Sequence, residues 1–166
     1  MTVDAAAPER VLVAGVGNIF LSDDGFGSAV ANELLTRPLP PVVRVVDYGI
    51  RGVHLAFDLT SDVSTLILVD TVPDAGGPGG VVVMEVDPAN YGAATFDAHS
   101  MDPNTVLQSV AALGDEMPRT LVVGCQPDSL DDGIGLTPSV AAAVPVAADT
   151  TSERARRERG SLKGPS

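Results

Sequence analysis

The chain has no tryptophan, only 4% aromatic residues and a single cysteine among its 166 residues. A core of this composition must be aliphatic, and no disulfide can form within the chain, so we expect a cytoplasmic protein. No apolar run approaches the roughly 20 residues that a membrane-spanning helix needs. The first ten residues include Asp4 and Glu9 and lack the apolar segment of a secretory signal.

Basic residues are also few, with 10 Lys and Arg against 22 Asp and Glu, which gives a formal net charge of −12. The charge is uneven, because residues 153–166 contain five basic and two acidic side chains. A protein with this much negative charge repels the phosphate backbone of nucleic acids, and we therefore expect no nucleic-acid partner. Taken alone, the acidity indicates no more than solubility.

The chain begins its ordered part with an apolar run, Val11–Ala14, that is typical of a buried strand. Gly15 and Gly17 follow and allow a tight turn or a close approach of two backbones. Ser22 or Asp23 is expected to cap the next helix by accepting backbone N–H bonds.

That helix has an apolar stripe, because Phe26, Val30 and Leu34 recur every four residues. Asp24 precedes it and follows the carboxyl end of the first strand. Open α/β sheets bind their ligands at this kind of position, which makes Asp24 a candidate site residue.

Strands and helices alternate along the rest of the chain. The pattern predicts an α/β fold, a three-layer sandwich of a mostly parallel twisted sheet of about five strands with helices on both faces. The segment 81–86 follows a Gly- and Pro-rich loop without a crossover helix, which favours an antiparallel strand. The remaining expected strands are 42–46, 65–70 and 120–123, and the expected helices are 52–59, 103–113 and 137–148.

Residues 1–150 are expected to form a single domain, and residues 151–166 a disordered tail. Pro145 is expected to kink the last helix or to end it early, because proline removes a helical hydrogen bond. The segment 47–52 is expected to be a loop with flexible glycines, and 87–101 a long loop that contains His99.

Four common types of site fit poorly. A dinucleotide fingerprint needs a third glycine where Phe20 stands, and Asp23 and Asp24 would repel a pyrophosphate. Neither a P-loop nor the Gly-x-Ser-x-Gly motif of serine hydrolases occurs. Cys125 could pair with His99 as a nucleophile, but a lone cysteine after an apolar strand is more typical of a buried hydrophobe.

A metal site is the remaining candidate. Asp24 and Asp70 both follow expected parallel strands, whose carboxyl ends meet at one edge of the sheet, and His99 could cover that edge. Two carboxylates and an imidazole suit a divalent ion such as Ni²⁺ or Zn²⁺. Separate roles remain open at this stage, with Asp24 at a helix start, Asp70 capping a loop and His99 on the surface.

These residues lie in motifs that resemble the nickel–iron hydrogenase maturation endopeptidases, peptidase family A31. The resemblance extends from about residue 11 to residue 148. It rests on Gly15-Val16-Gly17-Asn18, Asp23-Asp24-Gly25-Phe26-Gly27, Asp47-Tyr48-Gly49, Ile67-Leu68-Val69-Asp70, His99, Gly124-Cys125-Gln126-Pro127-Asp128-Ser129-Leu130 and Gly135-Leu136-Thr137-Pro138.

The resemblance implies an α/β sandwich and an endopeptidase, classed as aspartic-type, that removes the C-terminal peptide of a hydrogenase large-subunit precursor after nickel insertion. It places the catalytic and nickel-contacting roles on Asp24, Asp70 and His99, with the nickel carried by the substrate. The expected partner is the precursor. We expect the protein to be a monomer and to bind neither nucleic acid nor a membrane. Asp47 is a weaker candidate, either for shaping the cleft or for contacting the substrate.

The mechanism stays open, because neither Asp-Thr-Gly nor Asp-Ser-Gly of the two-aspartate proteases occurs. Our hypothesis is that nickel in the substrate acts as a Lewis acid near the scissile bond. Two alternatives remain, a metal-sensing or chaperone module that holds the precursor without cutting it, and a metal hydrolase for a small substrate.

Overall fold

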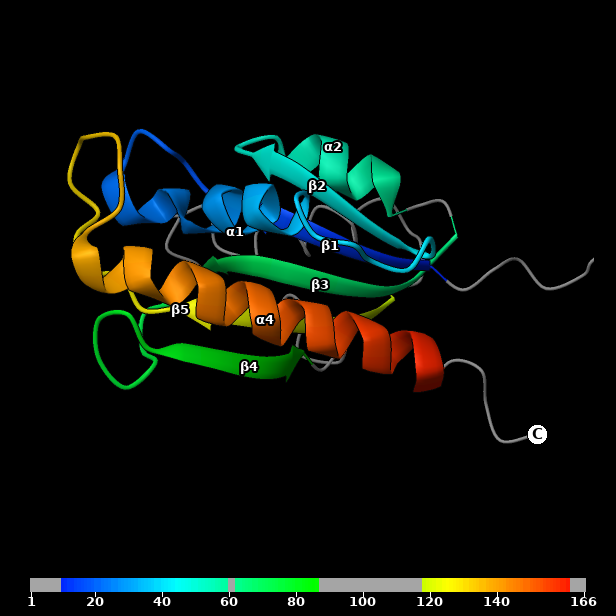
Figure 1. The fold of residues 1–166 in the computed structure, drawn as a ribbon. Helices are drawn as coiled ribbons and strands as arrows, with labels where there is room; N and C mark the ends of the chain where they lie inside the picture. Colours follow the sequence, from blue (N-terminus) through cyan, green and yellow to red (C-terminus); the bar gives the residue numbers. More distant parts are fainter. Residues whose placement is uncertain (1–9, 60–61, 87–117, 162–166) are drawn as a thin grey trace, which may run out of the picture.

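The computed structural model describes residues 10–59, 62–86 and 118–161, and these contain one five-stranded sheet. The strand order is β2-β1-β3-β5-β4 (Figure 1). β4 is antiparallel to β5, as the sequence predicts, and the other neighbouring strands are parallel. The strands are β1 (Arg10–Val16), β2 (Val43–Gly49), β3 (Val63–Thr71), β4 (Val81–Val86) and β5 (Arg119–Cys125).

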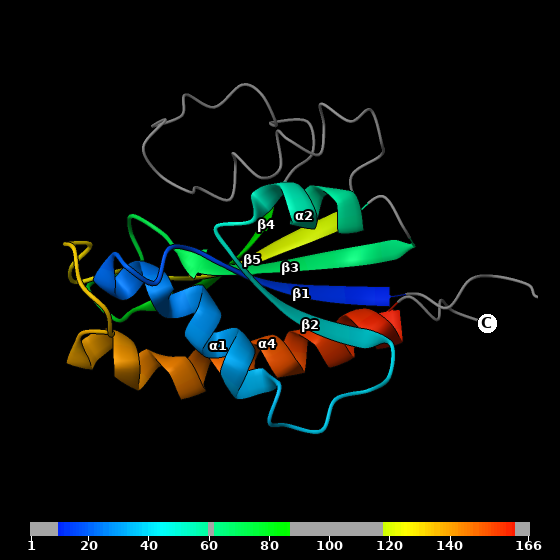
Figure 2. The ribbon, with the colours of Figure 1, turned by 90° about the horizontal axis from the view of Figure 1, so that it is seen from above.

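Helices cover both faces of the sheet, which confirms the predicted three-layer α/β architecture. α1 and α4 lie side by side on one face, and α2 lies on the other (Figure 2). No helix in the described ranges is long and apolar enough to cross a membrane. The helical elements are η1 (Ser22–Gly25, a 3₁₀ turn), α1 (Phe26–Leu34), α2 (Gly52–Asp58) and α4 (Pro138–Ser161).

The two faces of the sheet form separate apolar cores, because successive strand residues point to opposite sides. Val11 and Val13 of β1 pack under α1 and α4, where the stripe of Phe26, Val30 and Leu34 is fully buried as predicted. Leu12 and Ala14 face the opposite core, which includes Leu55 of α2. The expected helix 103–113 and the loop with His99 lie outside the described residues.

β2 is longer than predicted, since the segment Asp47–Gly49 is strand and not loop. Pairing with β1 extends it, with Asp47 opposite Gly15 and an irregularity before Gly49 meets Val16. The N–H of Gly17 then donates to the carbonyl of Gly49 at 2.9 Å. Tertiary pairing therefore overrides the local glycine signal and holds Asp47 at the carboxyl edge of the sheet.

The prediction for the last helix was wrong, because α4 continues through Pro145 to Ser161. Proline has no N–H, so one carbonyl in the preceding turn of α4 loses its helical hydrogen bond. Because Pro145 is exposed, this carbonyl can bind water instead. The opposite side of α4 is buried, and Thr151 and Ala155 are inaccessible within the segment expected to be a disordered tail. Residues 151–161 belong to the folded domain because this packing outweighs the cost of the proline.

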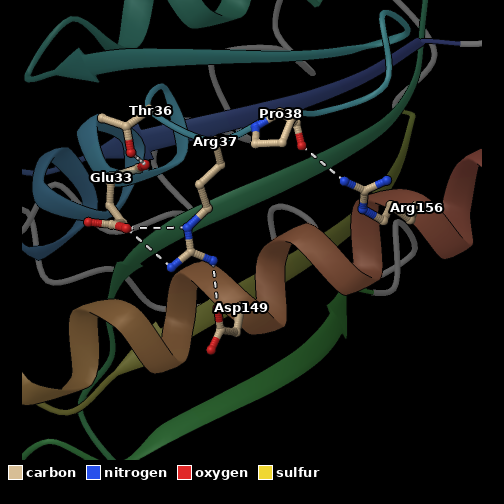
Figure 3. A network of polar contacts seen from close by, with 6 residues as sticks. All are labelled: Glu33, Thr36, Arg37, Pro38, Asp149 and Arg156. Atoms are coloured by element: carbon tan, nitrogen blue, oxygen red, sulfur yellow. Dashed lines mark hydrogen bonds and ion pairs between the residues drawn. The ribbon is translucent and has the colours of Figure 1, made fainter.

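A polar network joins α4 to the end of α1 (Figure 3). Arg37 donates to Glu33 at 3.2 Å and to Asp149 at 2.6 Å. Arg156 donates to the carbonyl of Pro38 at 2.9 Å. The network fixes the turn after α1 against two successive stretches of α4, which further explains why α4 is long.

Candidate functional site

Glycines place the first candidate carboxylate at the carboxyl end of β1. Gly17 has a φ of 135°, and a Cβ there would lie 2.0 Å from the carbonyl oxygen of Asp24. A Cβ on Gly27 would lie 2.3 Å from the Val16 carbonyl oxygen and 2.4 Å from that of Val69. The turn η1 can therefore lie against the end of β1, and the first turn of α1 against the ends of β1 and β3, only because these positions lack side chains.

Both oxygens of the Asp24 carboxylate are held. Oδ2 accepts a 2.7 Å hydrogen bond from the N–H of Asn18, and Oδ1 accepts one of 3.0 Å from the hydroxyl of Thr71. Thr71 ends β3, and it follows Asp70 directly. The side chain of Asp24 thus reaches from the end of β1 to the end of β3.

Asp70 is almost fully buried at the end of β3, with 1% of its surface exposed. Its Oδ1 accepts a 2.7 Å hydrogen bond from the N–H of Thr71. Thr71 therefore contacts both acids, one through its backbone and one through its hydroxyl. The structure brings Asp24 and Asp70 to one edge of the sheet, as their strand-end positions predict.

His99 lies outside the described residues, so its place relative to the two acids stays a prediction. Among the residues that the structure describes, no group of three or more His, Cys, Asp or Glu side chains is arranged to hold a metal ion. The described residues place two carboxylates, those of Asp24 and Asp70, at this edge of the sheet.

Asp23 has a role that differs from the predicted helix cap. Its buried carboxylate accepts hydrogen bonds from the N–H groups of Asp128, Ser129 and Thr137 and from the Thr137 hydroxyl, at 2.7 to 2.9 Å. α1 begins after Gly25 without a side-chain cap. Burial alone would raise the pKa of Asp23, but these four bonds hold the pKa below its ordinary value.

Asp23 thereby ties η1 to the loop 126–137, which leads into α4. Local sequence rules do not separate Asp23 from Asp24, since both acids are adjacent at a helix start; only the family resemblance singles out Asp24. Only the fold shows that Asp23 faces inward toward the loop 126–137 and that Asp24 faces the end of β3.

A cleft of about 430 Å³ is lined in part by Asn18, whose N–H donates to the Asp24 carboxylate; Asp24 itself is not in the lining. Asp47 lies in its wall, where the carboxylate accepts hydrogen bonds from the Ser28 hydroxyl at 2.7 Å and the Gly49 N–H at 3.1 Å. This fits the expectation that Asp47 shapes a cleft. The cleft is lined by Gly17, Asn18, Ile19, Phe20, Ser28, Asp47, Tyr48, Gly49, Ile50 and Arg51.

Cys125 is fully buried in the core beneath α1 and α4. Burial, with a smaller contribution from the charge of Asp23, raises the pKa of its thiol to about 11. A buried and protonated thiol is a poor nucleophile. The structure therefore favours the hydrophobic interpretation of Cys125 over a thiol pair with His99.

The family model for HycI, hydrogenase maturation protease, matches residues 29–153. The chain belongs to the hydrogenase maturation protease family. It is 36% identical over 141 residues to the hydrogenase expression/formation protein HupD of Rhodobacter capsulatus, across 82% of this chain and 67% of HupD. It is 32% identical over 138 residues to the hydrogenase 2 maturation protease of Escherichia coli, across 81% of this chain and 84% of that protein.

The fold agrees with a solved structure of this family. The hydrogenase maturating endopeptidase HybD of Escherichia coli superposes with a TM-score of 0.73 at 29% identity, covering 90% of this chain and 93% of HybD. The protein is thus a protease with an α/β sandwich fold, and the resemblance inferred from its motifs is confirmed.

Proposed function

We propose that the protease removes the C-terminal peptide of a nickel–iron hydrogenase large-subunit precursor and recognises nickel already bound in that precursor. The observation that carries the proposal is the 3.0 Å hydrogen bond between Thr71 and Asp24, because it brings the Asp24 carboxylate to the strand end that bears Asp70. Family membership supports the endopeptidase over the chaperone and small-substrate alternatives.

In this proposal Asp24, Asp70 and His99 contact the nickel and thereby position the scissile bond. Carboxylates and imidazole are suitable ligands for a divalent ion of this type. Nickel supplies Lewis acidity there, which polarises a peptide carbonyl or activates a water molecule. In this proposal the enzyme is aspartic-type in the sense that two aspartates are essential, and they act by binding the nickel of the substrate.

The hydrogen bonds to Asp24 support this role. Donors from Asn18 and Thr71 fix the orientation of the carboxylate and leave lone pairs of both oxygens for a metal, since each oxygen accepts one bond among those described. The nickel belongs to the substrate, so we expect the protease purified without added nickel to carry no stoichiometric metal. We further propose that it acts as a monomer in the cytoplasm.

Intact-mass measurement of the precursor tests the function directly. We expect the wild-type protease to shorten the nickel-loaded precursor, and Asp24→Ala, Asp70→Ala and His99→Ala to abolish the cleavage. Asp62→Asn is the control, because Asp62 is exposed beside the opposite end of β3. Full processing by all three alanine variants would refute the assignment, and binding without any mass change by the wild type would favour the chaperone alternative.

A further inference from the structure

Large apolar side chains gather on the loops at the carboxyl edge of the sheet. Ten large hydrophobic residues are exposed in the described ranges, and five of them lie here. Ile134 is the most exposed at 77%, followed by Phe20 at 62%. Exposed apolar residues grouped in this way indicate a binding surface. We refer to Ile19, Phe20, Ile50, Leu130 and Ile134 as the apolar rim.

The apolar rim has two parts. Three of its residues line one cleft, and the other two lie on a loop that is hydrogen-bonded to the first loop. Ile19, Phe20 and Ile50 line the cleft of about 430 Å³. Leu130 and Ile134 lie on the loop 126–137, which pairs with the first loop through a bridge between Leu21 and Gly133. Figure 1 shows these two loops side by side at the end of the molecule where β1 points.

The pair of loops is held by backbone hydrogen bonds. The N–H of Gly133 donates to the Phe20 carbonyl, and the N–H of Ser22 donates to the Gly133 carbonyl, both at 2.9 Å. Ser22 has a φ of 49°, and its hydroxyl donates to the carbonyl of Asp131 at 2.7 Å. A partner that binds the apolar rim would therefore lose little free energy to ordering these loops.

Acidic side chains border the apolar rim. Asp128, Asp131 and Asp132 are exposed on the loop 126–137. The cationic side chain on the cleft wall is Arg51, which donates to the carbonyls of Asp47 and Tyr48. An apolar centre with an acidic border complements a partner surface whose apolar residues are flanked by Lys and Arg.

We propose that the apolar rim docks the folded body of the hydrogenase large-subunit precursor, through an apolar surface of the precursor that is bordered by basic residues. The inference rests on the proposed function. The geometry supports this docking because Asn18, which directly precedes Ile19 of the apolar rim, donates a hydrogen bond to the Asp24 carboxylate. A precursor that brings its nickel to Asp24 must therefore lie against the loops that carry the apolar rim.

Steady-state processing of nickel-loaded precursor tests the proposal. The double variant Phe20→Ser with Ile134→Ser is expected to raise KM about tenfold or more, because central apolar anchors dominate interface energies, and to leave kcat within about twofold. Val146→Ser is the matched control, since Val146 is 53% exposed on α4, and it is expected to leave KM unchanged.

Charge is tested in the same assay. KM of the wild type should rise with NaCl concentration, and Asp131→Asn with Asp132→Asn should weaken that dependence. Asp62→Asn with Glu153→Gln removes the same number of acidic groups from other exposed sites and should not change it.

Hydrogen exchange of the wild-type protease with the precursor gives a readout that needs no variant. Protection at 18–21 and 128–134 supports the proposal. Protection confined to other segments, or an unchanged KM in the Phe20→Ser, Ile134→Ser variant, overturns it. Failure of the wild type to cleave the precursor would instead refute the proposed function, so the two failures can be told apart.

Discussion

At the scale of single residues, Asp23 and Asp24 show how adjacent identical side chains take separate roles. Asp23 is fully buried and accepts four hydrogen bonds from the loop 126–137, whereas Asp24 faces Thr71 at the end of β3. The sequence places both acids correctly at the edge of the sheet. Local sequence patterns cannot show that Asp23 binds this loop, because its donors lie more than 100 residues away.

Replacing Asp23 should therefore reduce stability. We expect Asp23→Asn to lower the free energy of unfolding by about 2 kcal/mol, since the amide oxygen cannot accept all four hydrogen bonds. Thr137→Val removes only the hydroxyl donor, so a loss of about 1 kcal/mol is expected. Urea unfolding followed by circular dichroism measures both, and equal stability of Asp23→Asn and wild type would contradict this role.

The pH dependence follows from the same carboxylate. The pKa of Asp23 in the folded protein lies below its ordinary value of 3.8, because the hydrogen bonds favour the charged form. Its stabilising contribution is thus present above about pH 4 and is lost as the pH falls through the lowered pKa. The difference in unfolding free energy between wild type and Asp23→Asn should shrink as the pH is lowered from 5 to about 2. A constant difference would contradict the assignment.

At the scale of elements, α4 shows where local sequence rules fail. Pro145 predicts an early end, but the helix continues for 16 residues beyond it to Ser161. The side chain of Glu158 is 7% exposed, and its Oε1 forms an ion pair with Nε of Arg119 in β5 at 2.7 Å. Contacts between distant segments decide the length of this helix, and a local pattern carries no information about them.

Truncation of α4 tests this correction. A variant that ends at Thr150 should be less stable than one that ends at Ser161 by about 2 kcal/mol or more, because it loses buried Thr151, Ala155 and Glu158. The expected fall in Tm is roughly 4 °C or more for a domain of this size. Equal melting temperatures in differential scanning calorimetry would support the disordered tail instead.

At the scale of the whole molecule, the sequence predicts the layers, the mostly parallel sheet and the meeting of Asp24 with the end of β3. It does so because parallel strands share a carboxyl edge, and because an apolar run followed by an acid identifies that edge. The strand character of Asp47–Gly49 and the inward-facing Asp23 depend on pairing and packing over long sequence distances. His99 stays a prediction of the motif alone.

We propose above that Asp24, Asp70 and His99 together bind nickel at the carboxyl edge of the sheet. Anomalous diffraction at the nickel absorption edge, from crystals of the protease grown with Ni²⁺, tests it most directly. The account predicts one nickel position within coordination distance of a carboxylate oxygen of each aspartate and of an imidazole nitrogen of His99. Nickel bound elsewhere, with these three groups too far apart to share an ion, would contradict it.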